Sequence, residues 1–143
     1  MELDFAFLAD SAEMTPQGLS VVGAGVDVVI APAVPTSHSQ LVLVARVIGT
    51  ADEARRDHTL RITVEGPGGL DLDIGARDLP FHALGPQYFS VAGGLSRYGM
   101  GAIQPFRGLP LPAYGVYAIT LELDDQPQPV KVLELEVVPP PVS

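Results

Sequence analysis

Hydrophobic and polar positions alternate with a period of two near the C-terminal end of the chain, in two runs separated by a polar segment. In the first run Tyr117, Ile119 and Leu121 share one parity, and smaller or polar residues occupy the other. Because successive side chains of a strand point to opposite faces, we expect these three to face a core. The second run, 130–138, alternates in the same way, and DDQPQP at 124–129 supplies turn formers. The pattern predicts a β-hairpin.

Short apolar runs predict further strands along the chain. Fourteen prolines and fifteen glycines separate them, which is typical of many short strands and unfavourable for long helices. The predicted strands lie at 3–9, 19–30, 41–48, 60–65 and 70–74, with one or two more within 87–106. With the hairpin they total about eight, a number typical of a sandwich. We therefore predict an all-β fold, namely a single-domain antiparallel β-sandwich over 1–138, immunoglobulin-like or jelly-roll-like, followed by a proline-rich tail at 139–143.

The run 41–47 is apolar at both parities, interrupted by Arg46. This pattern predicts a central strand or one whose outer face is covered. If Val42 and Val44 were open, they would form a patch that soluble monomers seldom carry, so another element or a second copy must cover them. Two-fold symmetry is a common way to bury such a surface, and we predict a dimer or higher homo-oligomer.

Two other segments carry local signals. Gly23 and Gly25 interrupt the second predicted strand, and because no helix follows them they predict a β-bulge rather than a phosphate-binding loop. The segment 50–57 can begin with Thr50 as a cap and has Glu53 three residues later. It is either one helical turn or a loop.

Two stretches at the ends of the chain resemble a family of small, uncharacterised bacterial and phage-associated proteins. They are LDFAFLADSAEMTPQGLSVVGAGVDVV at 3–29 and LPLPAYGVYAITLELDD at 109–125, whereas the middle matches poorly. The shared elements are an Ala-Asp pair that ends a strand, a Gly-bearing second strand and a Gly-x-Tyr strand, here Ala9, Asp10, Gly23, Gly25, Gly115 and Tyr117. The resemblance implies a β-sandwich domain and no activity that could be carried over.

Composition and charge narrow the function. A net charge of -9, with eight scattered basic residues, opposes binding to nucleic acid. Cysteine is absent, which removes disulfides, thiolate metal sites and cysteine nucleophiles. The short apolar run at the N-terminus is interrupted by acidic residues, so we expect neither a signal peptide nor a membrane span. These features favour a cytoplasmic protein.

The remaining polar residues form no recognisable catalytic or metal-binding motif. His38, His58 and His82 are far apart in sequence and lack metal-ligand spacing. The serines lack the Gly-x-Ser-x-Gly context of a nucleophile. We therefore predict no catalytic residue, no metal and no cofactor, and a protein that is not an enzyme.

Four aspartates leave an alternative open. Asp71 and Asp73 share a predicted strand face, whereas Asp124 and Asp125 lie in a turn. Oxygen ligands suit calcium, so the set could serve a calcium-dependent ligand- or lipid-binding sandwich or a hydrolase. No dense Asp-x-Asp-x-Asp loop supports this alternative, and turn aspartates are expected for local hydrogen bonding. Asp10, which ends the first predicted strand, is expected to organise the next turn.

Five of the nine aromatic residues lie between 77 and 112, among several prolines. They are Phe81, Tyr88, Phe89, Tyr98 and Phe106. Aromatic side chains on proline-stiffened segments can form a contact surface for a partner, and the alternative is that they fill or cap the core. The sequence thus predicts a non-catalytic binding or assembly module for a protein partner or a second copy, and it names no small-molecule ligand.

Overall fold

The structure is a computed structural model that describes residues 1–16, 18–82, 88–90, 97–124 and 126–142 of the chain. It is all-β, as predicted. The helical elements in these residues are one short helix, α1 (Ala51–Ala54), and a 3₁₀ turn, η1 (Pro67–Gly69). No helix in the described part of the chain is long and apolar enough to cross a membrane.

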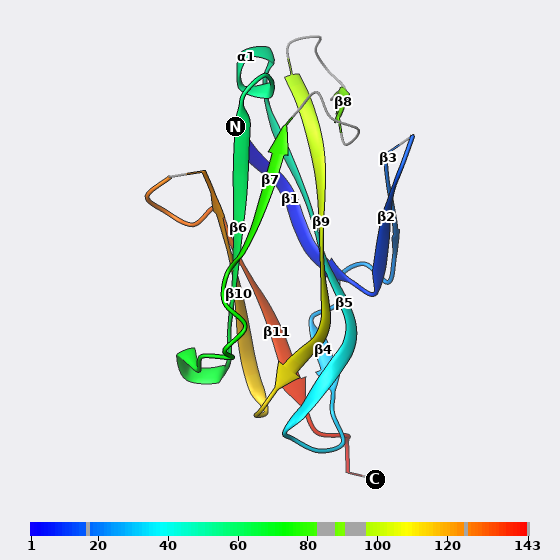
Figure 1. Cartoon of the computed structure of the whole chain (residues 1–143). Coiled ribbons are helices and arrows are strands. Elements are labelled where there is room, and N and C mark those ends of the chain that lie inside the picture. Colours follow the sequence, from blue (N-terminus) through cyan, green and yellow to red (C-terminus); the bar gives the residue numbers. More distant parts are fainter. Residues whose placement is uncertain (17, 83–87, 91–96, 125, 143) are drawn as a thin grey trace.

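Two main sheets face each other, and a hairpin lies on the outer side of one of them (Figure 1). The four-stranded sheet has the order β1 (Glu2–Ala9), β5 (Thr36–Thr50), β9 (Arg97–Leu111), β8 (Tyr88–Ser90). The five-stranded sheet has the order β4 (Val28–Ile30), β11 (Lys131–Val138), β10 (Gly115–Leu123), β6 (Asp57–Glu65), β7 (Arg77–His82). The hairpin pairs β2 (Ser11–Thr15) with β3 (Gly18–Val22).

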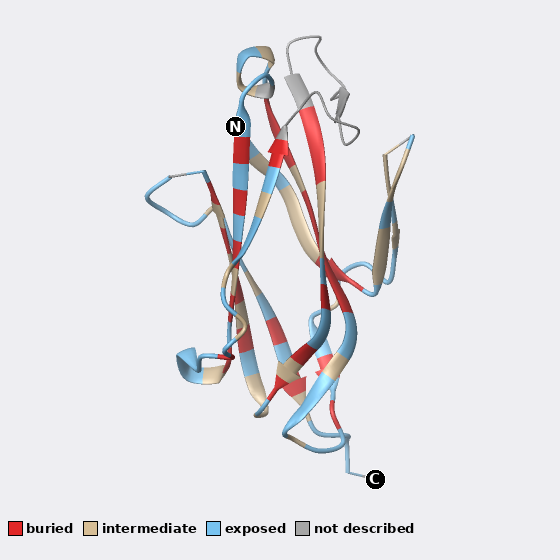
Figure 2. Ribbon diagram, in the orientation of Figure 1, coloured by how far each residue is buried: buried red, intermediate tan, exposed pale blue. Residues whose placement is uncertain are grey.

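The main core fills the space between the facing sheets. Tyr117, Ile119 and Leu121 of β10 are each at most 1% exposed, which confirms their predicted inward face. β10 pairs with β11 on one side and with β6 on the other, so the predicted C-terminal hairpin is also confirmed. Figure 2 shows the resulting alternation of buried and exposed residues along these strands.

A second, smaller core lies on the outer face of the four-stranded sheet, under the hairpin β2–β3. Val42 and Val44 of β5 are buried there, packed against Leu19 and Val21 of the hairpin. β5 lies between β1 and β9, so the prediction of a covered central strand is confirmed. Because the chain covers these valines itself, the reason given for a second copy does not hold, and the oligomeric state stays a prediction.

A glycine of β9 gives the hairpin room to approach the sheet. A Cβ added at Gly101 would lie 3.1 Å from Leu19 Cδ2 and 3.2 Å from Met14 Sδ, both in the hairpin. These separations are tighter than ordinary van der Waals contact, so a larger residue would push the hairpin outward. The absence of a side chain at Gly101 therefore sets the distance between the hairpin β2–β3 and the four-stranded sheet.

The predicted strand 19–30 is in fact two strands, β3 and β4, which belong to different sheets. Gly23 and Gly25 lie between them with φ of +69° and +84°. These left-handed conformations suit glycine and turn the chain from one layer to the other, so the β-bulge hypothesis was wrong. A Cβ at Gly23 would also overlap the Asp10 carboxylate.

Three further expectations need correction. The segment 70–74 is not a strand: Asp71 forms a single bridge with Glu65, and Asp73, at φ +58°, belongs to a turn. The polar strand β2 and the proline-containing β7 were not predicted, so the described residues contain eleven strands rather than about eight. β4 pairs with β11 in parallel, and the five-stranded sheet is therefore mixed rather than antiparallel.

The segment that follows β5 was expected to be either one helical turn or a loop, and it forms one helical turn, α1. Thr50 caps α1, because the Glu53 N–H donates to Thr50 Oγ1 at 3.3 Å and the Thr50 N–H donates to Glu53 Oε1 at 3.1 Å. These reciprocal bonds form a capping box, as the spacing of the two residues predicts.

Candidate functional site

His58, at the start of β6, is buried, and apart from tyrosine it is the one polar residue that is buried in the described part of the chain. It shares its parity with Leu60, Ile62 and Val64, which all face the core, so the strand alternation itself carries it inward. Its ring stacks on Phe81 of β7 with centroids 5.4 Å apart and planes at 23°. Sequence reasoning missed this placement, although the shared parity could have indicated it.

Both ring nitrogens of His58 face oxygen atoms. Nδ1 lies 2.8 Å from Asp124 Oδ2, and Nε2 lies 2.6 Å from the carbonyl oxygen of Glu53. The ring therefore joins α1 to the turn after β10. Asp124, in that turn, lies 66 residues after His58 in the sequence. Buried polar groups need such partners, because an unpaired one costs about 1–3 kcal/mol.

Asp124 has a conformation that suits this pairing. Its φ is +52°, a left-handed value that aspartate tolerates better than most residues. Its Oδ1 accepts the Thr59 N–H at 3.0 Å, and its own N–H donates to the Thr59 carbonyl at 2.8 Å. The carboxylate thus ties the end of β10 to the start of β6.

These contacts favour a structural role for the His58–Asp124 pair. A histidine acts as a general base through a ring nitrogen that can reach a substrate proton. Here the nitrogen opposite the carboxylate is occupied by the Glu53 carbonyl. The pair is therefore a cross-link between elements, and its geometry differs from that of a catalytic His–Asp pair, whose outer nitrogen faces the nucleophile.

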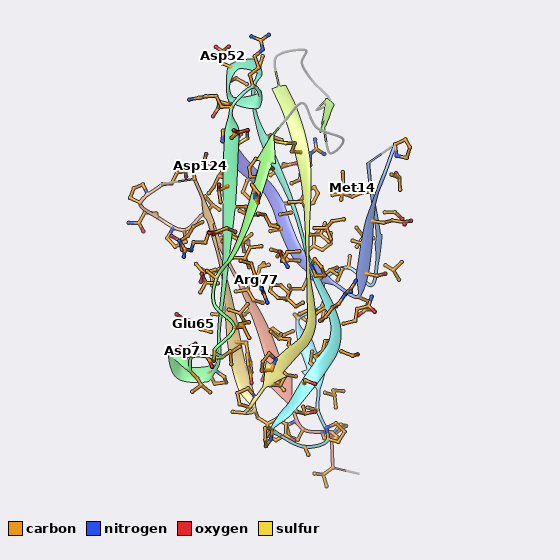
Figure 3. The ribbon with its side chains drawn as sticks, in the orientation of Figure 1. Met14, Asp52, Glu65, Asp71, Arg77 and Asp124 are labelled. Carbon is orange, nitrogen blue, oxygen red and sulfur yellow. The ribbon has the colours of Figure 1, made fainter. Side chains whose placement is uncertain are left out.

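The described aspartates that were considered as calcium ligands do not all lie together. Asp71 and Asp73 lie beyond one end of β6, where Asp71 Oδ1 accepts the Asp73 N–H at 2.8 Å. Asp124 lies by the other end of β6, and Figure 3 shows Asp71 and Asp124 well separated. Asp125 falls outside the described residues. The structure therefore does not gather this set into one site, and the described residues contain no group of three or more His, Cys, Asp or Glu suited to a metal ion.

The other two histidines lie on different sheets. His38 is half-buried on β5 of the four-stranded sheet, and His82 ends β7 of the five-stranded sheet. The backbone of His82 pairs with that of Asp57 at the edge of the sheet. The three histidines thus belong to separate strands, β5, β6 and β7, without converging on a described metal site.

The predicted aromatic contact residues divide into two groups. Phe81 and Phe106 are 8% and 5% exposed and belong to the main core, so their expected role in partner contact is corrected. The burial of these two rings follows from their inward parity on β7 and β9, opposite the other sheet. Tyr88, Phe89 and Tyr98 lie on paired segments of β8 and β9, and their side chains fall outside the description.

Asp10 lies in the connection between β1 and the hairpin. Its N–H donates to the Val22 carbonyl at 3.1 Å, and its carbonyl accepts from Gln40 Nε2 at 3.0 Å. Its carboxylate lies against Gly23, where no side chain would fit. The backbone contacts fasten the hairpin to β5, which is consistent with the structural role predicted for this residue.

The outer face of the five-stranded sheet carries exposed apolar side chains. Its large exposed members are Val28, Ile30, Val116 and Val132. Each alternates with a buried neighbour or with a residue that packs on the core, which places it on the side away from the core. In register, Glu136 of β11 lies between Val28 of β4 and Val116 of β10.

Acidic side chains lie among these valines. Glu134 pairs across strands with Ala118, and Ala118 pairs on its other side with Glu65. Glu65, Glu134 and Glu136 are all exposed. We name the surface formed by Val28, Ile30, Val116, Val132 and these three glutamates the acidic-apolar face.

Comparison with known proteins gives a family and no function. A family model described as a family of unknown function, DUF6941, matches residues 4–138. No curated protein and no solved structure matches the chain.

Proposed function

Because the chain belongs to DUF6941, a family without an assigned activity, we propose a function from its surface: a non-catalytic binding or assembly module that binds a protein partner through the acidic-apolar face. The observation that supports this most is the gathering of Val28, Ile30, Val116 and Val132 on one uncovered sheet face. Glutamates lie between these apolar side chains, and exposed apolar side chains interspersed with polar ones can form an interaction surface.

The chemistry of the face indicates the kind of partner. Val28 and Val116 flank Glu136, so a matching surface would need apolar side chains next to a cationic one. Lysine and arginine satisfy both needs, because their methylene stems cover apolar surface while their charged ends meet carboxylates. We therefore expect a protein partner with a basic, apolar patch, and its association should weaken as salt increases.

Self-association through the same face is disfavoured. In a two-fold symmetric contact each face meets the same face of the other copy, so an acidic surface packs on an acidic surface. The chain already carries a net charge of -9, so such a contact adds like-charge repulsion. Self-association into a homo-oligomer is consequently the second candidate for the function. A second candidate for the contact surface is the one formed by Tyr88, Phe89 and Tyr98.

Finer points of classification also belong to this proposal. The two facing sheets around one core support a sandwich. The resemblance described above supports a bacterial or phage-associated protein, and the acidic residues that interrupt the first apolar run support a cytoplasmic one. A calcium-dependent ligand- or lipid-binding protein or hydrolase remains the rival function, carried by Asp71, Asp73, Asp124 and Asp125.

The test removes the three valines of the face, keeps Ile30 and leaves the shape of the face unchanged. A triple variant, Val28→Thr, Val116→Thr and Val132→Thr, keeps β-branched side chains, and Val22→Thr on the hairpin is the matched control because Val22 is also exposed. The wild type, the triple variant and the control each serve as bait in a lysate of cells that naturally produce the protein, at low and at high salt. We expect a partner that the wild type and the control retain, that the triple variant loses and that high salt releases. Equal retention by the triple variant would contradict the proposal.

Light scattering separates the two kinds of partner. The wild type alone is expected to give a single species near 15.0 kDa. A larger species that the triple variant reduces to 15.0 kDa would instead assign the face to self-association.

A further inference from the structure

A hollow of about 410 Å³ lies on the opposite side of the molecule from the acidic-apolar face, where the hairpin meets the four-stranded sheet. It lies between β2 on one side and the paired strands β5 and β9 on the other. Its polar lining residues are Ser11, Ser39, Gln40 and Arg107, and its apolar ones include Val42 and Ile103. The volume falls within the range of about 300–1,000 Å³ that is usual for small-molecule sites.

The walls of the hollow are held in place by contacts described above. Gln40 Nε2 donates to the Asp10 carbonyl at 3.0 Å, which fixes the start of the hairpin to β5. Gln40 also lies opposite Arg107 in the β5–β9 ladder, and Val42 lies opposite Pro105. The hollow is therefore bounded by two paired strands and by a hairpin anchored to them.

The backbone of β9 changes direction next to Arg107. Phe106 and Leu109 are both buried although they are three residues apart, so the inward side of the strand switches parity between them. The switch coincides with Gly108, whose φ of +67° is left-handed. Arg107 lies just before this switch and keeps the parity of Ile103 and Pro105, so its exposed side chain lines the hollow beside theirs.

The charge of the hollow is unlike that of the rest of the protein. The chain has 17 acidic and 8 basic residues, yet none of the described residues that line the hollow is a carboxylate. Arg46 and Arg61 lie 3.4 and 3.7 Å from Asp4 and Asp78. Arg107 has no such ion pair among the described residues. A guanidinium without a carboxylate partner is available to bind an external oxyanion.

We propose that this hollow binds a small ligand that carries an oxyanion on an apolar body. Arg107 holds the oxyanion, the hydroxyls of Ser11 and Ser39 donate hydrogen bonds to it, and Val42 with Ile103 contacts the apolar part. Carboxylates and phosphates share this chemistry, because both accept paired hydrogen bonds from a guanidinium. The site is independent of the acidic-apolar face and of its partner.

The test is an NMR titration of the full chain with octanoate and with octyl phosphate, which present the two oxyanions on the same apolar body. Octanol and octylammonium are the uncharged and cationic controls. We expect saturable shifts of the backbone amides at 39–42, 103–104 and 106–107 with both anions, and much weaker effects from the two controls. The anion that binds more tightly identifies the headgroup.

Variants then assign the binding to the guanidinium. Arg107→Gln is expected to lower the affinity for the tighter-binding anion about tenfold or more, because a charge-assisted contact is lost. Arg107→Lys should retain part of the affinity, since it keeps the charge and loses the planar fork. Arg77→Gln, an exposed arginine on the other sheet, is the matched control and should bind as the wild type does.

Several results would overturn the proposal. They are equal binding of octanol and octanoate, unchanged affinity in Arg107→Gln, shifts confined to other parts of the molecule, and no saturable shift with either anion. The variants Val28→Thr, Val116→Thr and Val132→Thr should leave the titration unchanged, so a failure here does not bear on the proposed protein partner.

Discussion

The outer faces of the two main sheets differ in how far their apolar side chains are buried. On the four-stranded sheet, Val42 and Val44 are 6% and 0% exposed, because the hairpin β2–β3 covers them. On the five-stranded sheet, Val28 and Val132 are 47% and 50% exposed. Valines at outward positions thus lie in a core in one sheet and at the surface in the other. The difference shows that local alternation fixes which way a side chain points, whereas the arrangement of distant elements decides whether it is buried.

The strongest test of the comparison sets the inner side of β10 against its outer side. Ile119→Ala should lower the free energy of unfolding by about 2–5 kcal/mol, because it leaves a cavity in a packed core. Val116→Ala, on the outer side of the same strand, should change it by about 0.5 kcal/mol or less. Urea unfolding of both variants measures the difference. A comparable loss at the two positions would mean that the outer face is also packed.

The covered face can be opened at Gly101. Gly101→Val should cost about 1–3 kcal/mol, because the new side chain would collide with Leu19 and Met14. Faster hydrogen exchange at the amides of β2 and β3 is expected to accompany the loss. Val22→Ala, at an exposed position of the same hairpin, is the control and should leave the exchange of these amides unchanged. If Gly101→Val loses stability without faster exchange in the hairpin, the hairpin is not the element that it displaces.

The cross-link between α1 and the β10 turn should have a smaller effect. Asp124→Asn is expected to lower the free energy of unfolding by about 1 kcal/mol, because the charged contact to His58 is lost and the site is partly solvated. Asparagine tolerates the left-handed backbone, so the change isolates the side chain. Asp73→Asn is the matched control, since Asp73 also has a positive φ but does not contact a buried group. Thermal unfolding of both variants measures the difference, and equal stability in the two would show that the His58 contact contributes nothing.

Calcium is expected to have the smallest effect. A ligand that binds only the folded state raises its stability, so a calcium site would raise Tm. Asp71 and Asp73 lie at the other end of β6 from Asp124, and we therefore expect the same Tm in calcium and in EDTA. A calcium-dependent rise that Asp71→Asn abolishes would restore the metal-dependent function as the leading candidate.

Sequence patterns predicted the features that depend on neighbours along the chain. The inward face of β10 follows from its period of two, and the cap of α1 follows from the spacing of Thr50 and Glu53. Both are decided within a few residues, where the backbone geometry is local.

Other features depend on residues far apart in sequence. The division of 19–30 between two sheets depends on where β4 finds a partner, which is β11. The pairing of His58 with Asp124 has no spacing signal, because 66 residues separate them. The hollow beside Arg107 likewise combines residues of β2, β5 and β9, so no single stretch of sequence contains the site.

The parallel pairing of β4 with β11 has a consequence for the order in which the molecule can assemble. Val28 pairs with Glu136, so the edge of the five-stranded sheet joins segments roughly 100 residues apart. During synthesis, β4 has no partner until β11 has left the ribosome. The hairpin β2–β3, in contrast, pairs within a dozen residues and can form early. The N-terminal part of the chain therefore contains both an early-forming element and one whose docking waits for the last strand.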